Sequence, residues 1–443
     1  MKFRLNRIVY VSFVSFLLLI VWAVSGVVLM NRVDIEPSEA VSAKRTVKVL
    51  IRTGSESAGL RQIAKVFEKE SGIQVEFIEL GRDVYFTSVG TQLFAGTNAF
   101  DVVFLPNTSI AQFADTKALQ PLDPFMNDSR YTDRQTFDVD DFLSTYPYKG
   151  ATFALPTDIS THFLYYRSDI ISKPPETWDE LYAVAEKFTK QRNEDSPTRW
   201  GLAMPAVVPE ERSKIFSSLL WTYGGDVIEE NTGEVLFDQA GSISAGSFLN
   251  RLVQERIVPS DMITWDFSRT RDALLSGEIA MAAPYWNSAI DMIKQSDSPY
   301  KNAIKIALIP GIRDQAGGIY RTPFQHGWML AMNANAKHPV DAWEFIKFAT
   351  GKRGGSIYAQ FGGVPARRSI LSDPSFSSKR PDFALILESM KTAKAEPSLT
   401  YYPAMVEIEN DALAKILTLH EDPKSTLLYA ASKLRNLVEK VRN

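Results

Sequence analysis

Two short apolar stretches near the start of the chain decide the fold: T-V-K-V-L-I-R at residues 46–52 and F-D-V-V-F-L at residues 100–105. Each has the length and the β-branched or aromatic content of a buried strand. The residues between them predict a helix that stops at Gly72, a strand over 73–80 and a second helix that runs to Gly96. This β-α-β-α-β order is typical of a doubly wound parallel sheet, which binds ligands beyond the carboxyl ends of its strands.

The pattern of strands and helices continues to the end of the chain. Further strands are expected within the apolar segments at residues 151–156, 163–166, 279–283, 304–309 and 327–332. Further helices are expected at residues 213–223, 240–256, 268–275, 339–350, 383–392, 403–419 and 425–441. Another helix is expected to begin after Thr177, whose hydroxyl can cap it, with Trp178 in the core. The fold class is therefore α/β.

The N-terminus predicts export. No charged residue lies between Ile8 and Met30, and a helix of about 20 apolar residues spans a bilayer. Three cations precede this run and acidic residues follow it, an order that places the body of the protein outside the cytoplasm. The run is either an uncleaved anchor, which we favour, or a signal peptide cleaved near Ala23-Val24-Ser25. Residues 31–45 are expected to be a polar tether.

Composition excludes several classes of protein. With 443 residues, the chain is long enough for two domains or more, and its net charge of −3 includes no basic block of the nucleic-acid-binding type. The chain contains no cysteine, which excludes disulfides, thiolate metal sites and a cysteine nucleophile. The four histidines lie far apart in the sequence, so zinc binding has no local signature. We therefore expect neither a cofactor nor a metal.

A series of motifs carries a family resemblance across the whole exported chain. They are G-T-N-A-F-D-V-V at 96–103, L-Q-P-L-D at 119–123, Y-K-G-A-T-F-A-L-P-T-D-I-S-T-H-F-L-Y-Y-R at 148–167, P-E-T-W-D-E-L at 175–181, L-S-G-E-I-A-M at 275–281, Y-W at 285–286, G-W-M-L-A at 327–331 and G-G-V-P-A-R at 362–367. Their order resembles that of the extracytoplasmic solute-binding proteins of ABC importers, in particular the sugar-binding group similar to maltose-binding protein. Two departures are Arg167, where the family often has Asn, and the insert at Ile319–Gln325.

The resemblance implies a two-lobed periplasmic-binding-protein fold. Each lobe would be a doubly wound sheet flanked by helices, and crossing segments near residues 158–166, near 325–330 and after Val364 would form the hinge. The implied domains are 1–30 (signal or anchor), 31–45 (tether), 46–158 and 328–365 (lobe one), and 159–327 and 366–443 (lobe two). The ligand would lie in a cleft between the lobes, which closes by hinge motion.

Candidate ligand-binding residues combine polar groups for sugar hydroxyls with flat rings for the C–H faces of a sugar. Glu56, Asn107 and Asp158 follow predicted strands, and Trp286 matches the stacking tryptophan of the family. The resemblance adds Tyr223, Trp328, Arg367 and Tyr402. Each has a structural alternative: a tryptophan in the core, a helix cap at Glu56, or a hinge turn at Asp158. For Asn107, Tyr223, Arg367 and Tyr402 the alternative is a loop hydrogen bond or surface stacking.

The expected function is the capture of a sugar or related polyhydroxylated solute and its delivery to membrane permease subunits. A monomer is expected, without a nucleic-acid partner. No nucleophile motif or catalytic acid pair is found, and Asp138, Asp140 and Asp141 are interpreted as a solvated helix start, so an enzyme is not expected. Two alternatives stay open. The protein is a tethered sensory module for a membrane receptor, or it binds a polyamine, an anion or ferric ion.

Overall fold

The computed structural model describes residues 44–207 and 209–442, and it begins with the predicted β-α-β-α-β unit. The five elements are β1 (Thr46–Arg52), α2 (Ser55–Ser71), β2 (Gln74–Leu80), α3 (Arg82–Phe94) and β3 (Val102–Pro106). The three strands pair in parallel, as expected, and β1 lies between β2 and β3. Helix α2 ends at Gly72, whose φ of 73° is the left-handed conformation that glycine adopts without strain. This part of the prediction is confirmed.

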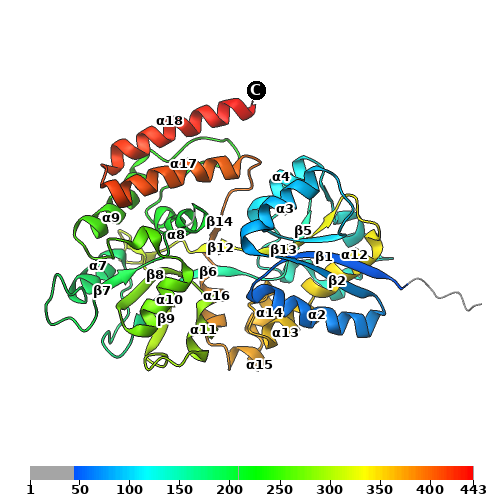
Figure 1. Ribbon diagram of the computed structural model, residues 1–443, viewed down its shortest axis with the longest axis horizontal. Coiled ribbons are helices and arrows are strands. Elements are labelled where there is room, and N and C mark those ends of the chain that lie inside the picture. Colours follow the sequence, from blue (N-terminus) through cyan, green and yellow to red (C-terminus); the bar gives the residue numbers. More distant parts are fainter. Residues whose placement is uncertain (1–43, 208, 443) are drawn as a thin grey trace, which may run out of the picture. The chain divides into compact units, whose positions relative to one another are not determined.

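The first sheet is mixed because a strand from late in the chain joins it. Its order is β2-β1-β3-β13-β4, and β5 also pairs with β13. The added strands are β4 (Leu119–Gln120), β5 (Ala154–Pro156) and β13 (Trp328–Asn333). Strand β13 runs antiparallel to β3. Helices α3 and α4 (Ile110–Asp115) lie on one side of this sheet, and α2 and α13 (Lys352–Gln360) lie on the other (Figure 1).

The second sheet is also mixed and has the order β14-β12-β6-β8-β7, with β9 paired to β6. Its strands are β6 (Ser160–Arg167), β7 (Trp200–Ala203), β8 (Ile279–Trp286), β9 (Ile304–Leu308), β12 (Phe324–His326) and β14 (Lys394–Ala395). Side chains alternate between the two faces of β6: Phe163 and Tyr165 pack into one hydrophobic core, and Leu164 packs into another. The sheet is therefore covered on both faces.

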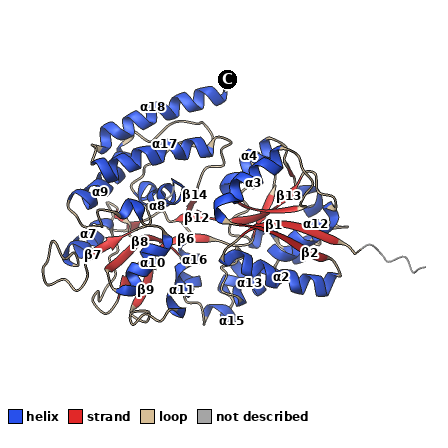
Figure 2. Ribbon diagram, viewed as in Figure 1, coloured by secondary structure: helices blue, strands red, loops and turns tan. Residues whose placement is uncertain are grey.

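Helices form the two covers of the second sheet (Figure 2). The core that contains Leu164 is built with α7 (Trp178–Lys187), α8 (Pro209–Thr222), α9 (Ala240–Gln254), α17 (Tyr402–Ala414) and α18 (Pro423–Arg442). The core that contains Phe163 is built with α10 (Phe267–Ser276), α11 (Ala289–Gln295), α14 (Arg368–Ser372) and α16 (Asp382–Ser389). Thr177 caps α7 by accepting a hydrogen bond from Glu180 N, and Trp178 is 1% exposed, as predicted.

The remaining elements are short, apart from α12 (Pro339–Thr350), which packs against the first sheet and has the bounds that the sequence predicts. They are η1 (Asn107–Ser109), α5 (Asp123–Met126), α6 (Arg134–Phe137), η2 (Val139–Asp141), η3 (Met262–Thr264), β10 (Ile312–Arg313), β11 (Ile319–Tyr320), α15 (Pro374–Ser377) and η4 (Lys415–Leu419), a π-helical turn that extends α17. The insert at Ile319–Gln325 thus contributes to β11 and β12.

One predicted boundary is wrong in a way that matters for the site. We expected a strand over 279–283 that stops at Pro284, but β8 continues to Trp286. Strand β7 pairs with β8 only as far as Ala282, so Pro284 lies beyond the end of that partner. A proline is tolerated there because the missing N–H breaks no bond to β7. Trp286 is therefore the last residue of a central strand, opposite His162 of β6.

The N-terminal anchor or signal at residues 1–30 and nearly all of the tether lie outside the described residues. Among the helices that the structure describes, none is long and apolar enough to cross a membrane.

Candidate functional site

The chain passes between the two sheets at two neighbouring places, residues 157–159 and Gly327. Backbone hydrogen bonds join them, because Thr157 N donates to Trp328 O over 2.9 Å. A third segment lies alongside, since Ile159 N donates to Val364 O over 3.0 Å. The strands that enter and leave these segments present their ends to the same region, so side chains from both sheets meet here.

Asp158 and Asn107 lie at this junction, and both are buried. Asp158 Oδ1 accepts a hydrogen bond from Trp328 N over 2.8 Å, and Asn107 Oδ1 accepts one from Gly327 N over 3.2 Å. Their exposed fractions are 5% and 4%. These contacts assign both side chains to the support of the crossing segments, which is the hinge alternative for Asp158. Direct ligand contact by either residue stays a prediction.

Trp328 lies on the first-sheet side of the junction. Its ring stacks on Phe104 at a centroid distance of 4.9 Å, and the Arg52 guanidinium lies 4.2 Å from its centroid. Phe86 contacts the same ring at 6.2 Å. Trp328 is 7% exposed, so little of its surface is left for a ligand. Phe86, which is only partly buried, is the more accessible ring on this side.

Trp286 lies on the second-sheet side and is partly exposed. Its indole Nε1 donates to Glu211 Oε1 over 3.2 Å. The rings of His162 and Phe324 meet it edge to face at 4.3 and 5.5 Å, which fixes the plane of the indole. A flat ring held in one orientation and open on part of its surface is suited to stack on the C–H face of a sugar.

A buried polar cluster lies beside Trp286. Its centre is Glu396, just after β14, which accepts a hydrogen bond from Tyr402 Oη. His326 Nδ1 lies 3.0 Å from Glu396 Oε2, and Lys214 Nζ lies 3.9 Å from Glu396 Oε1. The centroids of the His326 and Trp286 rings are 6.3 Å apart, so the cluster lies next to the candidate stacking ring. We call these four residues, Lys214, His326, Glu396 and Tyr402, the hinge cluster.

Electrostatics keep Glu396 ionised. Burial alone would raise the pKa of its carboxyl group, but the Lys214 ammonium, His326 and the Tyr402 hydroxyl together lower it below the usual value. His162, behind Trp286, is affected in the opposite sense: burial, with the charges of His326 and Lys214, holds its pKa well below the usual value, so its imidazole is neutral. The region therefore offers a carboxylate and an ammonium next to uncharged rings.

Three other predicted residues lie away from this cluster or are not described. Arg367 is 1% exposed, and its guanidinium donates to Thr350 O and Asp138 O and lies 3.3 Å from Asp141 Oδ2. Asp141 is thus a buried partner of Arg367, not part of a solvated helix start as we expected. Tyr223 directly follows α8, is partly buried and packs on Phe248, and burial raises its pKa to about 12. The side chain of Glu56, in the first turn of α2, lies outside the described part.

Sequence reasoning missed three members of the hinge cluster and Glu211. His326 could have been found, because it directly precedes Gly327-Trp328 in the predicted crossing. Lys214 and Glu211 lie one helical turn apart on α8, on a face that only the packing of α8 against β6 and β12 reveals. No sequence motif next to Glu396 indicates that it belongs to the site.

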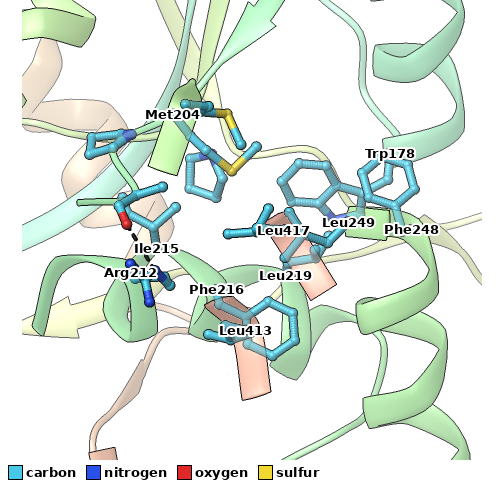
Figure 3. Close-up of a pocket in the computed structure, with 14 residues that line it drawn as sticks. Trp178, Met204, Arg212, Ile215, Phe216, Leu219, Phe248, Leu249, Leu413 and Leu417 are labelled. Atoms are coloured by element: carbon cyan, nitrogen blue, oxygen red, sulfur yellow. Dashed lines mark hydrogen bonds between the residues drawn. The ribbon is translucent and has the colours of Figure 1, made fainter. Parts of the chain in front are cut away.

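A separate cavity lies inside the second-sheet core (Figure 3). Its lining is apolar and includes Trp178, Met204, Leu219, Phe248, Leu413 and Leu417. The Arg212 guanidinium lies at its edge but donates to Ala206 O over 2.8 Å and to Asn410 O over 3.1 Å. A site without polar groups for hydroxyls cannot orient a sugar, so this cavity is not the candidate site.

Comparison with known proteins agrees with the two-sheet architecture. Residues 62–384 match the family model described as "Bacterial extracellular solute-binding protein". The chain belongs to that family. It is a family of non-enzymatic binding proteins, in line with the expectation from the sequence.

Individual relatives of this solute-binding protein are distant. The erythritol/L-threitol-binding protein of Mycolicibacterium smegmatis is 23% identical over 81% of this chain and 78% of its own length. The maltose-bound MalE3 structure of T. maritima has a TM-score of 0.76 at 23% identity, covering 88% of this chain and 99% of that one. An ABC transporter solute-binding protein of Agrobacterium radiobacter K84 in complex with ribitol has a TM-score of 0.76 at 19% identity, covering 89% and 98%. These structures show that the fold is the periplasmic-binding-protein fold.

Proposed function

We propose that this solute-binding protein captures an uncharged sugar or polyol and delivers it to the permease of an ABC importer. The observation that carries the proposal is the placement of the partly exposed Trp286 ring beside the charged hinge cluster. A sugar or polyol has apolar C–H faces and hydroxyl edges, and it needs both kinds of partner. The names of the relatives support this choice, since they report erythritol, L-threitol, maltose and ribitol as ligands.

We further propose that the two sheets belong to two lobes, with residues 46–158 and 328–365 in one and residues 159–327 and 366–443 in the other. The crossing segments act as the hinge, and ligand binding favours the closed arrangement because the ligand contacts both lobes there. Trp286 and the hinge cluster contact the ligand from lobe two, and Phe86 and Arg52 face it from lobe one. Asp158 and Asn107 keep the crossing segments together during this motion.

A thermal-unfolding screen of the purified protein tests the proposal. The probes are erythritol, ribitol, D-mannitol and maltose, with spermidine, sulfate and ferric citrate for the competing ligand classes. A probe present at 100 times its Kd stabilises the protein by about 2.7 kcal/mol. We expect an uncharged probe to give this shift and to be recovered chemically unchanged. Stabilisation by spermidine, sulfate or ferric citrate alone would contradict the proposal.

A further inference from the structure

One face of α8 points toward the junction between the two sheets. Glu211, Lys214 and Ser218 lie three and then four residues apart, so their side chains point the same way. Glu211 accepts from Trp286 Nε1, and Ser218 Oγ accepts from Phe324 N over 3.2 Å and contacts His162 Nδ1 at 2.8 Å. Lys214, between them, is therefore aimed at the region beside Trp286.

Lys214 is nearly buried yet makes no hydrogen bond within the described chain. Its side chain is 10% exposed, and its ammonium lies 3.9 Å from Glu396 Oε1, beyond hydrogen-bonding distance. Lys214 Nζ can therefore donate to a ligand group in the region beside Trp286.

Glu396 Oε1 can accept one more hydrogen bond. Tyr402 Oη donates to Oε1 and His326 Nδ1 lies against Oε2, but each carboxylate oxygen can accept two hydrogen bonds. Because Lys214 Nζ and Glu396 Oε1 are 3.9 Å apart, a single hydroxyl oxygen can lie about 2.8 Å from both of them. That hydroxyl would accept from the ammonium and donate to the carboxylate, and a hydroxyl oxygen can take both roles at once.

We propose that Lys214 and Glu396 together hold one hydroxyl of the ligand and select uncharged polyhydroxylated ligands over the matching sugar acids. The inference rests on the proposed function and adds the specificity-determining pair. A ligand carboxylate would gain an ion pair with Lys214, but it brings no proton for Glu396 and meets a second negative charge there.

Calorimetry with pairs of probes tests this inference: D-mannitol with D-mannonate, and ribitol with D-ribonate. The wild-type protein is expected to prefer the neutral member by at least about tenfold.

Lys214→Met retains the apolar stem but loses the donors, and it should weaken binding of the neutral probe by about tenfold. Lys214→Gln restores donors without charge and should bind with intermediate affinity. Glu396→Gln should shift the acid-to-neutral affinity ratio toward the acid by about tenfold.

The controls separate a binding role from a structural one. Lys415→Met removes a lysine that pairs with Asp411 on the surface, and it should leave affinity unchanged. Circular dichroism and the ligand-free melting temperature report folding of each variant. Neutral binding within twofold of wild type in both Lys214 variants, or an unchanged acid-to-neutral ratio in Glu396→Gln, would overturn the inference while leaving the proposed function intact. Wild-type protein that binds none of the four neutral screening probes would overturn both.

Discussion

Replacement of Trp286 by alanine is expected to weaken binding of a sugar or polyol by about tenfold to a hundredfold. The indole is held edge to face by His162 and Phe324 and is partly exposed, so a ligand that stacks on it buries apolar surface that alanine cannot offer. Loss of such a contact costs about 1.5–3 kcal/mol. Calorimetry with the strongest neutral probe measures the change in Kd.

Trp200→Ala is the matched control for this substitution. Trp200 is also a partly exposed strand tryptophan of the second sheet, but it pairs with Ile279 at the opposite end of β8. Its replacement should leave the Kd unchanged. Equal affinities of the Trp286→Ala variant and the wild type, or a fall of its ligand-free melting temperature by more than about 10 °C, would show that Trp286 belongs to the core and not to the binding site.

The second large effect concerns stability and Glu409, which is buried on the inner face of α17. Burial and the nearby charges of Glu396 and Asp226 raise the pKa of Glu409 to about 8. The folded protein therefore keeps a proton that the unfolded chain has already released between about pH 4.5 and pH 8. Because the folded state binds more protons in this window, Glu409 makes the free energy of unfolding fall as pH rises.

Glu409→Gln should remove this dependence. Between pH 5 and pH 8, the variant should gain stability relative to wild type by up to about 1.4 kcal/mol per pH unit, and the difference should level off above pH 8. Urea unfolding followed by circular dichroism measures it. Glu407→Gln, an exposed change on the same helix, is the control and should follow the wild-type profile. Parallel profiles for Glu409→Gln and wild type would show that Glu409 is ionised in the folded protein.

The sequence predicted those parts of the fold that local pattern determines. The first five elements, α7 and α12 are set by apolar periodicity and by terminal signals such as Gly72 and Thr177, and these elements appear as expected. The end of β8 was missed because proline normally ends a strand, and only the pairing with β6 shows that the strand goes on to Trp286. Pairing partners distant in sequence are not encoded in a local window.

The site was harder to predict for the same reason. Trp286 follows a recognisable motif, but the hinge cluster brings together residues of α8, β12, the segment after β14 and α17. The buried polar contacts of two predicted ligand-binding residues were also unexpected. Arg367 contacts Thr350, Asp138 and Asp141 instead of facing the candidate site. Tyr402 donates a hydrogen bond to Glu396. Tyr402 thus enters the candidate site through a residue that the sequence did not indicate.

The most direct test of the central proposal is a crystal structure of the protein with its strongest neutral probe bound. We expect ligand carbons within about 4 Å of the Trp286 ring and a ligand hydroxyl within hydrogen-bonding distance of both Lys214 Nζ and Glu396 Oε1. A ligand bound in the apolar cavity beside Trp178 and Phe248, or anywhere that leaves Trp286 and the hinge cluster without contact, would contradict it.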